Sequence, residues 1–220
     1  MDTSSPPHTV HSHRVLVFDV ETNGLLPKFG ANDLKNYPYI LQLSYIIYDV
    51  GNDKILQEFD SYVDIDSSIP ISNKITELTG ITRESCKNGL SMVEILKKFQ
   101  EAYAFCNGQL VAHNIDFDSK MIGVEIERHR PILEIHCPQV FSVFNPFYEK
   151  IHNIDRYCTM KNGTNRCNIM MPSKIPGKPP TPKWPKLIEL HNHLFNNETI
   201  NGLHNSLIDV KVCLRCYLKM

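Results

Sequence analysis

The run RVLVFDVET, residues 14–22, restricts the fold more than any other part of the chain, because its side chains alternate with a period of two. This period is typical of a β-strand, whose successive side chains point to opposite faces of a sheet. Both faces carry apolar residues, so we expect the strand to be buried. One face carries Val15 and Val17, and the other carries Leu16, Phe18 and Val20.

Two further β-rich runs, over residues 39–50 and 55–63, are joined by Gly-Asn-Asp at 51–53. A short turn of this composition between two strands favours an antiparallel hairpin. We therefore expect the first three strands to form an antiparallel meander.

Strands and helices alternate in the rest of the chain. Ser91-Met-Val-Glu94 is a capping box, and the apolar residues after it recur at spacings of three and four, which predicts a helix with one apolar stripe. The alternation predicts a mixed α/β sheet. The other expected elements are a strand over 109–112 and helices over 118–128, 186–196 and 206–220, the last capped by Asn205.

Residues 1–12 are polar and rich in serine and proline, without the basic start or apolar middle of a signal peptide, so we expect a disordered tail. No run approaches the roughly 18 apolar residues that a membrane helix needs. Residues 13–220 show no convincing linker and predict one domain. Seven cysteines, an odd number in a chain that needs no disulfides, favour a reducing intracellular location, in the cytoplasm or nucleus.

The net charge of −1 argues against a protein that coats long stretches of nucleic acid. Positive charge is nevertheless concentrated between residues 150 and 186, which we call the basic segment. This segment is either a solvated loop or a surface that attracts phosphates. Its basic residues are Lys150, Arg156, Lys161, Arg166, Lys174, Lys178, Lys183 and Lys186, against the single acid Asp155.

Asp19 and Glu21 end the first strand on the same face, because side chains two apart in a strand point the same way. Two ionised carboxylates this close repel each other unless a cation lies between them. The pair is suited to a hard divalent ion such as Mg²⁺ or Mn²⁺. Taken alone, such a pair is more often two solvated acids where a strand emerges.

The sequence VAHNIDFD, residues 111–118, places a second acid where the expected strand over 109–112 leads into a helix. The positive end of a helix favours a carboxylate, which makes Asp118 a candidate ligand and Asp116 a weaker one. The alternative is that Asp118 only caps the helix.

A third cluster, GLHNSLID, covers residues 202–209. Asp209 is expected on the first turns of the last helix, and His204 in the loop before it. A histidine on a loop is suited to take a proton from water near neutral pH, although a surface histidine without a role is the alternative.

In this order the three clusters resemble the motifs of the DEDDh 3′→5′ exonucleases, a family of polymerase proofreading subunits and other DNA- and RNA-trimming enzymes. FDVETNGL, AHNIDFD and HNSLIDV, the last with its His-x₄-Asp spacing, carry the resemblance. ELTGIT at 77–82 looks like the family's turn after the third strand, and YCTM at 157–160 like its fifth strand. The resemblance covers about residues 14–217, and two stretches, 131–155 and 161–185, look inserted.

The resemblance implies a ribonuclease-H-like fold, in which a mixed five-stranded sheet, three antiparallel strands first and then parallel ones, has helices on both faces. It implies hydrolysis of single-stranded DNA or RNA from the 3′ end to nucleoside 5′-monophosphates, with two Mg²⁺ ions for which Mn²⁺ can substitute. The implied metal ligands are Asp19, Glu21, Asp118 and Asp209, with His204 as general base. The implied substrate contacts are Thr22, Gly24, Leu25 as a wedge against the last base, and Asn114.

The resemblance leaves several alternatives open. A catalytically silent module that binds nucleic acid or a polymerase would keep the same fold, but it should lose at least one ligand, and all four acids and the histidine are present. A ribonuclease that trims RNA is a further possibility, since recognition of the 2′-hydroxyl cannot be read from sequence. A polymerase or a replication or repair complex is the expected partner. Cys213-Leu-Arg-Cys216 has the spacing of a zinc site but no second pair, so we expect core cysteines.

Overall fold

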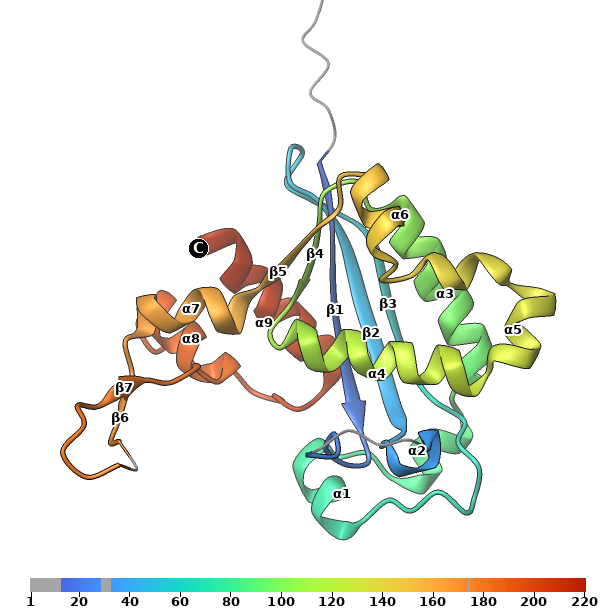
Figure 1. The fold of residues 1–220 in the computed structure, drawn as a ribbon, viewed down its shortest axis with the longest axis horizontal. Helices are drawn as coiled ribbons and strands as arrows, with labels where there is room; N and C mark the ends of the chain where they lie inside the picture. The colour runs from blue at the N-terminus through green and yellow to red at the C-terminus, as the bar shows by residue number, and fades with distance from the viewer. Residues whose placement is uncertain (1–12, 29–32, 174) are drawn as a thin grey trace, which may run out of the picture.

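The strand β1 (Arg14–Thr22) occupies the centre of the main sheet, as its apolar residues on both faces require (Figure 1). The computed structural model describes residues 13–28, 33–173 and 175–220. The expected disordered tail over residues 1–12 lies outside the described residues. No helix in the described part of the chain is long and apolar enough to cross a membrane.

The sheet has five strands in the order β3-β2-β1-β4-β5. β2 (Ile40–Asp49) pairs antiparallel with β1 and with β3 (Lys54–Tyr62), so the expected meander is confirmed. β4 (Gln109–Ala112) runs parallel to β1, and β5 (Asp155–Cys158) runs parallel to β4. The expected mixed sheet, antiparallel first and then parallel, is therefore confirmed.

Helices cover both faces of this sheet (Figure 1). Leu16, Phe18 and Val20 belong to a core cluster with residues of α3 (Met92–Phe105) and α4 (Ile115–Arg128). Val15 and Val17 pack on the other face against α9 (Ser206–Lys219). The two faces of β1 thus meet different helices, and both are removed from water.

Helix starts were predicted with unequal success. The Ser91 capping box is present, and Asn205 caps α9 by accepting a hydrogen bond from the backbone N–H of Ile208. α4 begins at Ile115, three residues before the predicted start at Asp118. Asp118 therefore lies inside the first turn and is not the cap, so the capping alternative for this residue is wrong.

The stretches expected as insertions contain regular structure. Residues 131–155 include α6 (Pro146–Ile151) and supply Leu133, Val140 and Val143 to the core. The expected fifth strand at 157–160 ends at Cys158, because Thr159 and Met160 open a helix. The other elements are η1 (Leu34–Asn36), α1 (Asn73–Thr79), α2 (Arg83–Lys87), α5 (Arg130–His136), η2 (Pro138–Ser142), α7 (Thr159–Cys167), β6 (Met170–Met171), β7 (Thr181–Pro182) and α8 (Leu187–Leu194).

A buried ion pair fixes the end of α4 to the segment that leads into β2. Arg128 donates to the Glu125 carboxylate at 2.5 Å, and its side chain is 9% exposed. The same guanidinium donates to the backbone carbonyls of Leu34, Tyr37 and Pro38. Because Glu125 is only 2% exposed, its charge depends on this partner.

We expect Arg128→Met to lower the free energy of unfolding by about 3–5 kcal/mol, because it leaves the Glu125 carboxylate buried without its guanidinium partner. Arg130→Met is the matched control, since Arg130 pairs with Glu127 and Glu134 at exposed positions, where such pairs contribute about 1 kcal/mol or less. Urea unfolding followed by circular dichroism measures both. Equal losses in the two variants would contradict the dependence on burial.

Candidate active site

Three chain segments bring the predicted acids together at the end of β1. Asp19 and Glu21 lie near the carboxyl end of that strand. Asp118, on the first turn of α4, accepts a hydrogen bond from the backbone N–H of Val20 at 3.3 Å. This bond holds the Asp118 carboxylate against β1 at Val20, the residue between Asp19 and Glu21.

The start of α9 is fixed to the same place. The Ser206 hydroxyl donates to the backbone carbonyl of Asp19 at 2.7 Å, so the first turn of α9 sits against β1. Asp209 lies in this first turn, and its carboxylate accepts a hydrogen bond from the backbone N–H of His204 at 3.2 Å. Both helix acids, Asp118 and Asp209, therefore lie where the helix dipole favours negative charge.

His204 is an exposed residue in the left-handed region, with φ 68°. This backbone conformation is uncommon for residues other than glycine, although asparagine, aspartate and histidine adopt it more often than the rest. It carries the chain from the loop into the Asn205 cap, and it brings the imidazole beside the acids. Among the described residues, Glu21, His204 and Asp209 form a group whose potential ligand atoms all lie within 4.8 Å of one another.

All four acids of this site have raised pKa values. Burial and the nearby Asp209 carboxylate raise the pKa of Asp19 to about 8. Burial, Asp19 and Asp209 raise the pKa of Glu21 to about 9. Burial also raises the pKa of Asp118, with a contribution from Asp19, and that of Asp209 to about 6. Perturbation of several acids at one point is typical of a functional site.

Two buried oxygens in the site have no hydrogen-bond partner, Oδ2 of Asp19 and Oδ1 of Asp209. An unsatisfied buried acceptor is costly, so a ligand at this position would be favoured. Carboxylate oxygens are the donors that hard divalent ions prefer. The residues present thus fit such an ion, with Asp19, Glu21, Asp118 and Asp209 as the oxygen donors.

A cleft of about 690 Å³ opens over these residues, within the usual range of roughly 300–1,000 Å³ for ligand sites. Leu25 is 86% exposed beside it, and Asn114 lines it. Thr22 does not reach the cleft, because it is buried and its hydroxyl donates to the backbone carbonyl of Gly24. The residues lining the cleft are Asp19, Val20, Glu21, Leu25, His113, Asn114, Phe117, Asp118, Met160, Trp184, Pro185, Lys186, Leu187, Ile188, Leu203, His204 and Asp209.

Several lining residues were not predicted from the sequence. Phe117 could have been found as the neighbour of Asp118 on the same turn. Trp184 and its successors follow a proline-rich run without periodicity, so the only available signal was that Trp184 is the single tryptophan in the chain. Asp116, the weaker candidate, is exposed and forms an ion pair with Lys161, so it is not part of the site.

Ion pairs neutralise three of the eight basic residues of the basic segment. Arg156 pairs with Glu149, Lys161 with Asp116, and Lys183 with Glu189. Lys174 lies outside the described residues. Lys186 is exposed and lines the cleft together with the predicted acids.

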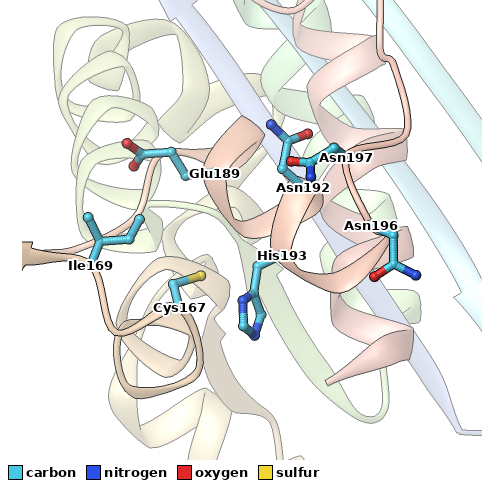
Figure 2. Close-up of a pocket in the computed structure, with 7 residues that line it drawn as sticks. All are labelled: Cys167, Ile169, Glu189, Asn192, His193, Asn196 and Asn197. Carbon is cyan, nitrogen blue, oxygen red and sulfur yellow. The ribbon is translucent and has the colours of Figure 1, made fainter.

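A second hollow of about 490 Å³ lies between α7 and α8 (Figure 2). Its one acid, Glu189, is already bound by the Lys183 ammonium at 2.6 Å and by the backbone N–H of Lys186 at 2.7 Å. Burial raises the pKa of the Cys167 thiol, which disfavours the thiolate. The hollow therefore lacks the convergent charges of the first cleft. Its lining is Cys167, Ile169, Glu189, Asn192, His193, Asn196 and Asn197.

Cys213 and Cys216 are core residues, as expected. All seven carry free thiols. Cys213 and Cys216 are buried on α9, where Cys213 packs under β1 and Cys216 in a separate apolar cluster. They share no metal-binding group within the described residues.

A family model described as exonuclease (RNase_T) matches residues 16–217, nearly the whole chain. The chain belongs to this exonuclease family. The resemblance to DEDDh exonucleases and the expectation of a nuclease are thereby confirmed, and the ribonuclease-H-like fold is supported by the solved structures below.

The exonuclease domain is similar to part of the PolC-type DNA polymerase III of Streptococcus thermophilus, with 40% identity over 116 residues. That match covers 52% of this chain and 7% of the polymerase. It also resembles the nuclease domain of 3′hExo, a DEDDh family member bound to rAMP, with a TM-score of 0.62, 16% identity, and coverage of 96% of this chain and 92% of that one.

A zinc-bound complex of Escherichia coli ExoI with single-stranded DNA gives a TM-score of 0.65 at 14% identity, over 94% of this chain and 40% of ExoI. At these identities the two solved structures show the common fold. The exonuclease domain thus shares its fold with enzymes whose structures hold a nucleotide, a DNA strand or a divalent ion.

Without a cation, the stability of the exonuclease domain should fall as pH rises. The folded-state pKa values of Asp19 and Glu21, about 8 and about 9, exceed their usual values of 3.8 and 4.5. Between about pH 4 and pH 9 the folded state therefore binds more protons than the unfolded state, and stability decreases through this window. Thermal unfolding in EDTA at several pH values measures the decrease.

Glu21→Gln removes one of these carboxyls and should flatten that pH dependence. At pH 8 it should raise the melting temperature of the metal-free protein by about 2–4 °C, the effect of about 1 kcal/mol in a domain of this size. Glu77→Gln is the control, since Glu77 is exposed on α1, outside the cleft. If the melting temperature of Glu21→Gln depends on pH as that of the wild type does, the inferred repulsion among the carboxyl groups is contradicted.

Proposed function

We propose that the protein is a metal-dependent exonuclease that removes nucleotides from the 3′ end of single-stranded DNA or RNA and releases nucleoside 5′-monophosphates. The observation that carries this proposal is the convergence of Asp19, Glu21, Asp118, Asp209 and His204 on one cleft in a member of the exonuclease family. Phosphodiester hydrolysis needs neutralised phosphate oxygens and an activated water, and this set of side chains can provide both.

The four carboxylates would hold two divalent ions, Mg²⁺ or Mn²⁺. The partnerless oxygens of Asp19 and Asp209 and the raised pKa values of all four acids support this assignment. When bound, such a pair of ions supplies activation of water and stabilisation of the leaving 3′ oxygen. The acids themselves fix the position of the scissile phosphate at the end of β1.

His204 would act as the general base. Its imidazole is exposed to the water of the cleft, and its backbone N–H donates to Asp209, so the loop and the acid are held together. A histidine with access to water can take a proton near neutral pH and release it to solvent.

The 3′-terminal nucleotide would lie beside Leu25, whose exposed side chain can wedge against the last base. Asn23 holds the turn that presents it, because its side-chain oxygen accepts from the backbone N–H of Tyr39 at 2.7 Å. Thr22 and Gly24 would shape this turn, and Asn114 would support the strand from the amino end of α4.

The similarity to a segment of a PolC-type polymerase supports a role beside a polymerase or a replication or repair complex. The chain spans only 7% of that relative, so the pathway is part of the proposal. Strands of DNA and RNA, each labelled at the 3′ or 5′ end and incubated with Mg²⁺, Mn²⁺ or EDTA, test the direction, the sugar preference and the ion dependence together. A silent module would bind these strands without cleaving them.

Asp19→Asn should abolish hydrolysis, because it removes an oxygen donor at the point where the four acids meet. Product is measured as labelled mononucleotide released from a 3′-labelled strand. Asp116→Asn is the matched control on α4, since Asp116 is exposed and paired with Lys161, and it should keep wild-type activity. Equal activity of Asp19→Asn and wild type would contradict the proposed metal-dependent mechanism.

His204→Ala should reduce kcat by about 10²–10⁴-fold, the usual contribution of a general base. It should retain most of the rise in melting temperature that divalent ions give, because all four acids remain. His193→Ala, at an exposed position of α8 outside the cleft, is the control. Wild-type turnover of His204→Ala from pH 6 to pH 9 would exclude His204 from proton transfer.

A further inference from the structure

The cleft has a second wall that contains none of the predicted acids. Met160 of α7, Leu203 and the five consecutive residues from Trp184 to Ile188 line it. In Figure 1, α7 and α8 lie at the amino-terminal end of α4, opposite the end that leads into α5. The segment from β7 to α8 therefore brings a long stretch of backbone to the catalytic acids, although about 165 residues separate Trp184 from Asp19 in sequence.

A partly buried histidine ties this segment to the sheet. His113, just after β4, has Nε2 3.0 Å from the backbone carbonyl of Pro185 and Nδ1 3.0 Å from the Thr159 hydroxyl. A carbonyl oxygen can only accept, so Nε2 carries the proton and Nδ1 accepts from Thr159. Burial lowers the pKa of His113 to about 4, which keeps the ring neutral and these two bonds intact near neutral pH.

Packing adds to this attachment. Pro185 is buried, and a Cβ placed on Gly163 of α7 would come within 3.3 Å of the Pro185 ring and 2.9 Å of Leu190. The absence of a side chain at Gly163 is therefore what lets α7 approach the segment so closely. On the other side, Lys183 forms an ion pair with Glu189 of α8. Trp184 lies between these two anchored residues.

Trp184 remains 61% exposed on this fixed backbone. Its neighbour Pro185 faces the interior, whereas the indole stays at the cleft. A large aromatic side chain held in the open, next to a group of acids, gains little from the core of its own protein. Its rigid attachment is what a stacking surface requires, because the ring need not be ordered when a ligand binds.

We propose that Trp184 is a stacking platform for a base near the 3′ end of the single strand. This inference rests on the proposed function, because it takes the cleft as the path of the strand. The indole offers a π-face that any base can use, in DNA or RNA, and stacking of this kind tolerates sequence. Lys186, two residues on and exposed in the same cleft, is placed to attract the backbone phosphates.

The two walls of the cleft would then contact different nucleotides of the strand. Leu25 and Phe117 lie on the side of β1 and α4, where the terminal nucleotide meets the acids. Trp184 lies on the side of the α7–α8 segment and would hold a neighbouring base. A strand held at two points enters with its scissile phosphate over the acids, so loss of one point should weaken binding more than it slows the chemical step.

Steady-state kinetics on an oligothymidylate of eight nucleotides tests this division. Trp184→Ala should raise KM about tenfold, within a range of roughly five- to hundredfold for loss of one stacked base, with kcat nearly unchanged. Trp184→Phe should recover most of the loss, because a phenyl ring still stacks. The p-nitrophenyl ester of thymidine 5′-monophosphate has a single base, so its hydrolysis should be the same in wild type and Trp184→Ala.

Fluorescence gives a readout that does not depend on hydrolysis. Trp184 is the single tryptophan, so all tryptophan emission reports on this position. With Ca²⁺ present, titration with the same oligonucleotide should quench the emission. Abasic nucleotides placed one at a time over the last four positions should abolish most of the quenching at one position and leave it at the others.

Each outcome separates this inference from the proposed function. Quenching that depends on one base, with or without hydrolysis, supports the platform. Absent quenching, equal quenching by every abasic strand, or a wild-type KM in Trp184→Ala overturns it. If the wild-type protein cleaves neither the oligonucleotide nor the ester, the proposed activity fails, and the base-dependent quenching still decides the stacking.

Discussion

The mutual repulsion of four carboxyl groups at the end of β1 is the constraint on which the rest of the structure depends. Burial raises the pKa values of Asp19, Glu21, Asp118 and Asp209, and neighbouring acids raise those of Asp19, Glu21 and Asp118 further. A fold can hold such a cluster only if each acid sits on an element that is fixed elsewhere. The first turns of α4 and α9 offset part of the repulsion through their dipoles, and the remainder favours binding of cations.

Apolar burial on both faces of β1 and two hydrogen bonds to its backbone hold the elements that carry these acids in place. Val20 donates to Asp118 and Ser206 donates to the carbonyl of Asp19, so each helix start is set relative to the strand. Two exposed side chains, those of His204 and Trp184, are attached to this framework. His204 lies on a loop in a left-handed conformation, and Trp184 lies on a segment tied down by His113. Preorganised acids combined with exposed side chains suit a site that must admit a polymer end.

Local sequence rules worked where the decisive interactions are local. The alternation over residues 14–22, the Ser91 capping box and the Asn205 cap all depend on neighbours within four residues, and each was predicted correctly. The start of α4 was missed, because Asn114 at its N-cap makes no side-chain cap bond and Asp118 resembled a cap. α7 was missed because its sequence, TMKNGTNRC, has little apolar periodicity and is stabilised by contact with α8.

The sequence by itself determined the sheet, the family motifs and the identity of the acids, because periodicity and motif order are properties of the linear chain. Only the tertiary structure decided how the acids meet: Asp116, the weaker candidate, pairs with Lys161, whereas Asp118 accepts a hydrogen bond from the backbone of β1. It also decided the second wall of the cleft. The His113 to Pro185 bond joins residues 72 positions apart, and no local pattern encodes a contact that arises from the packing of whole elements.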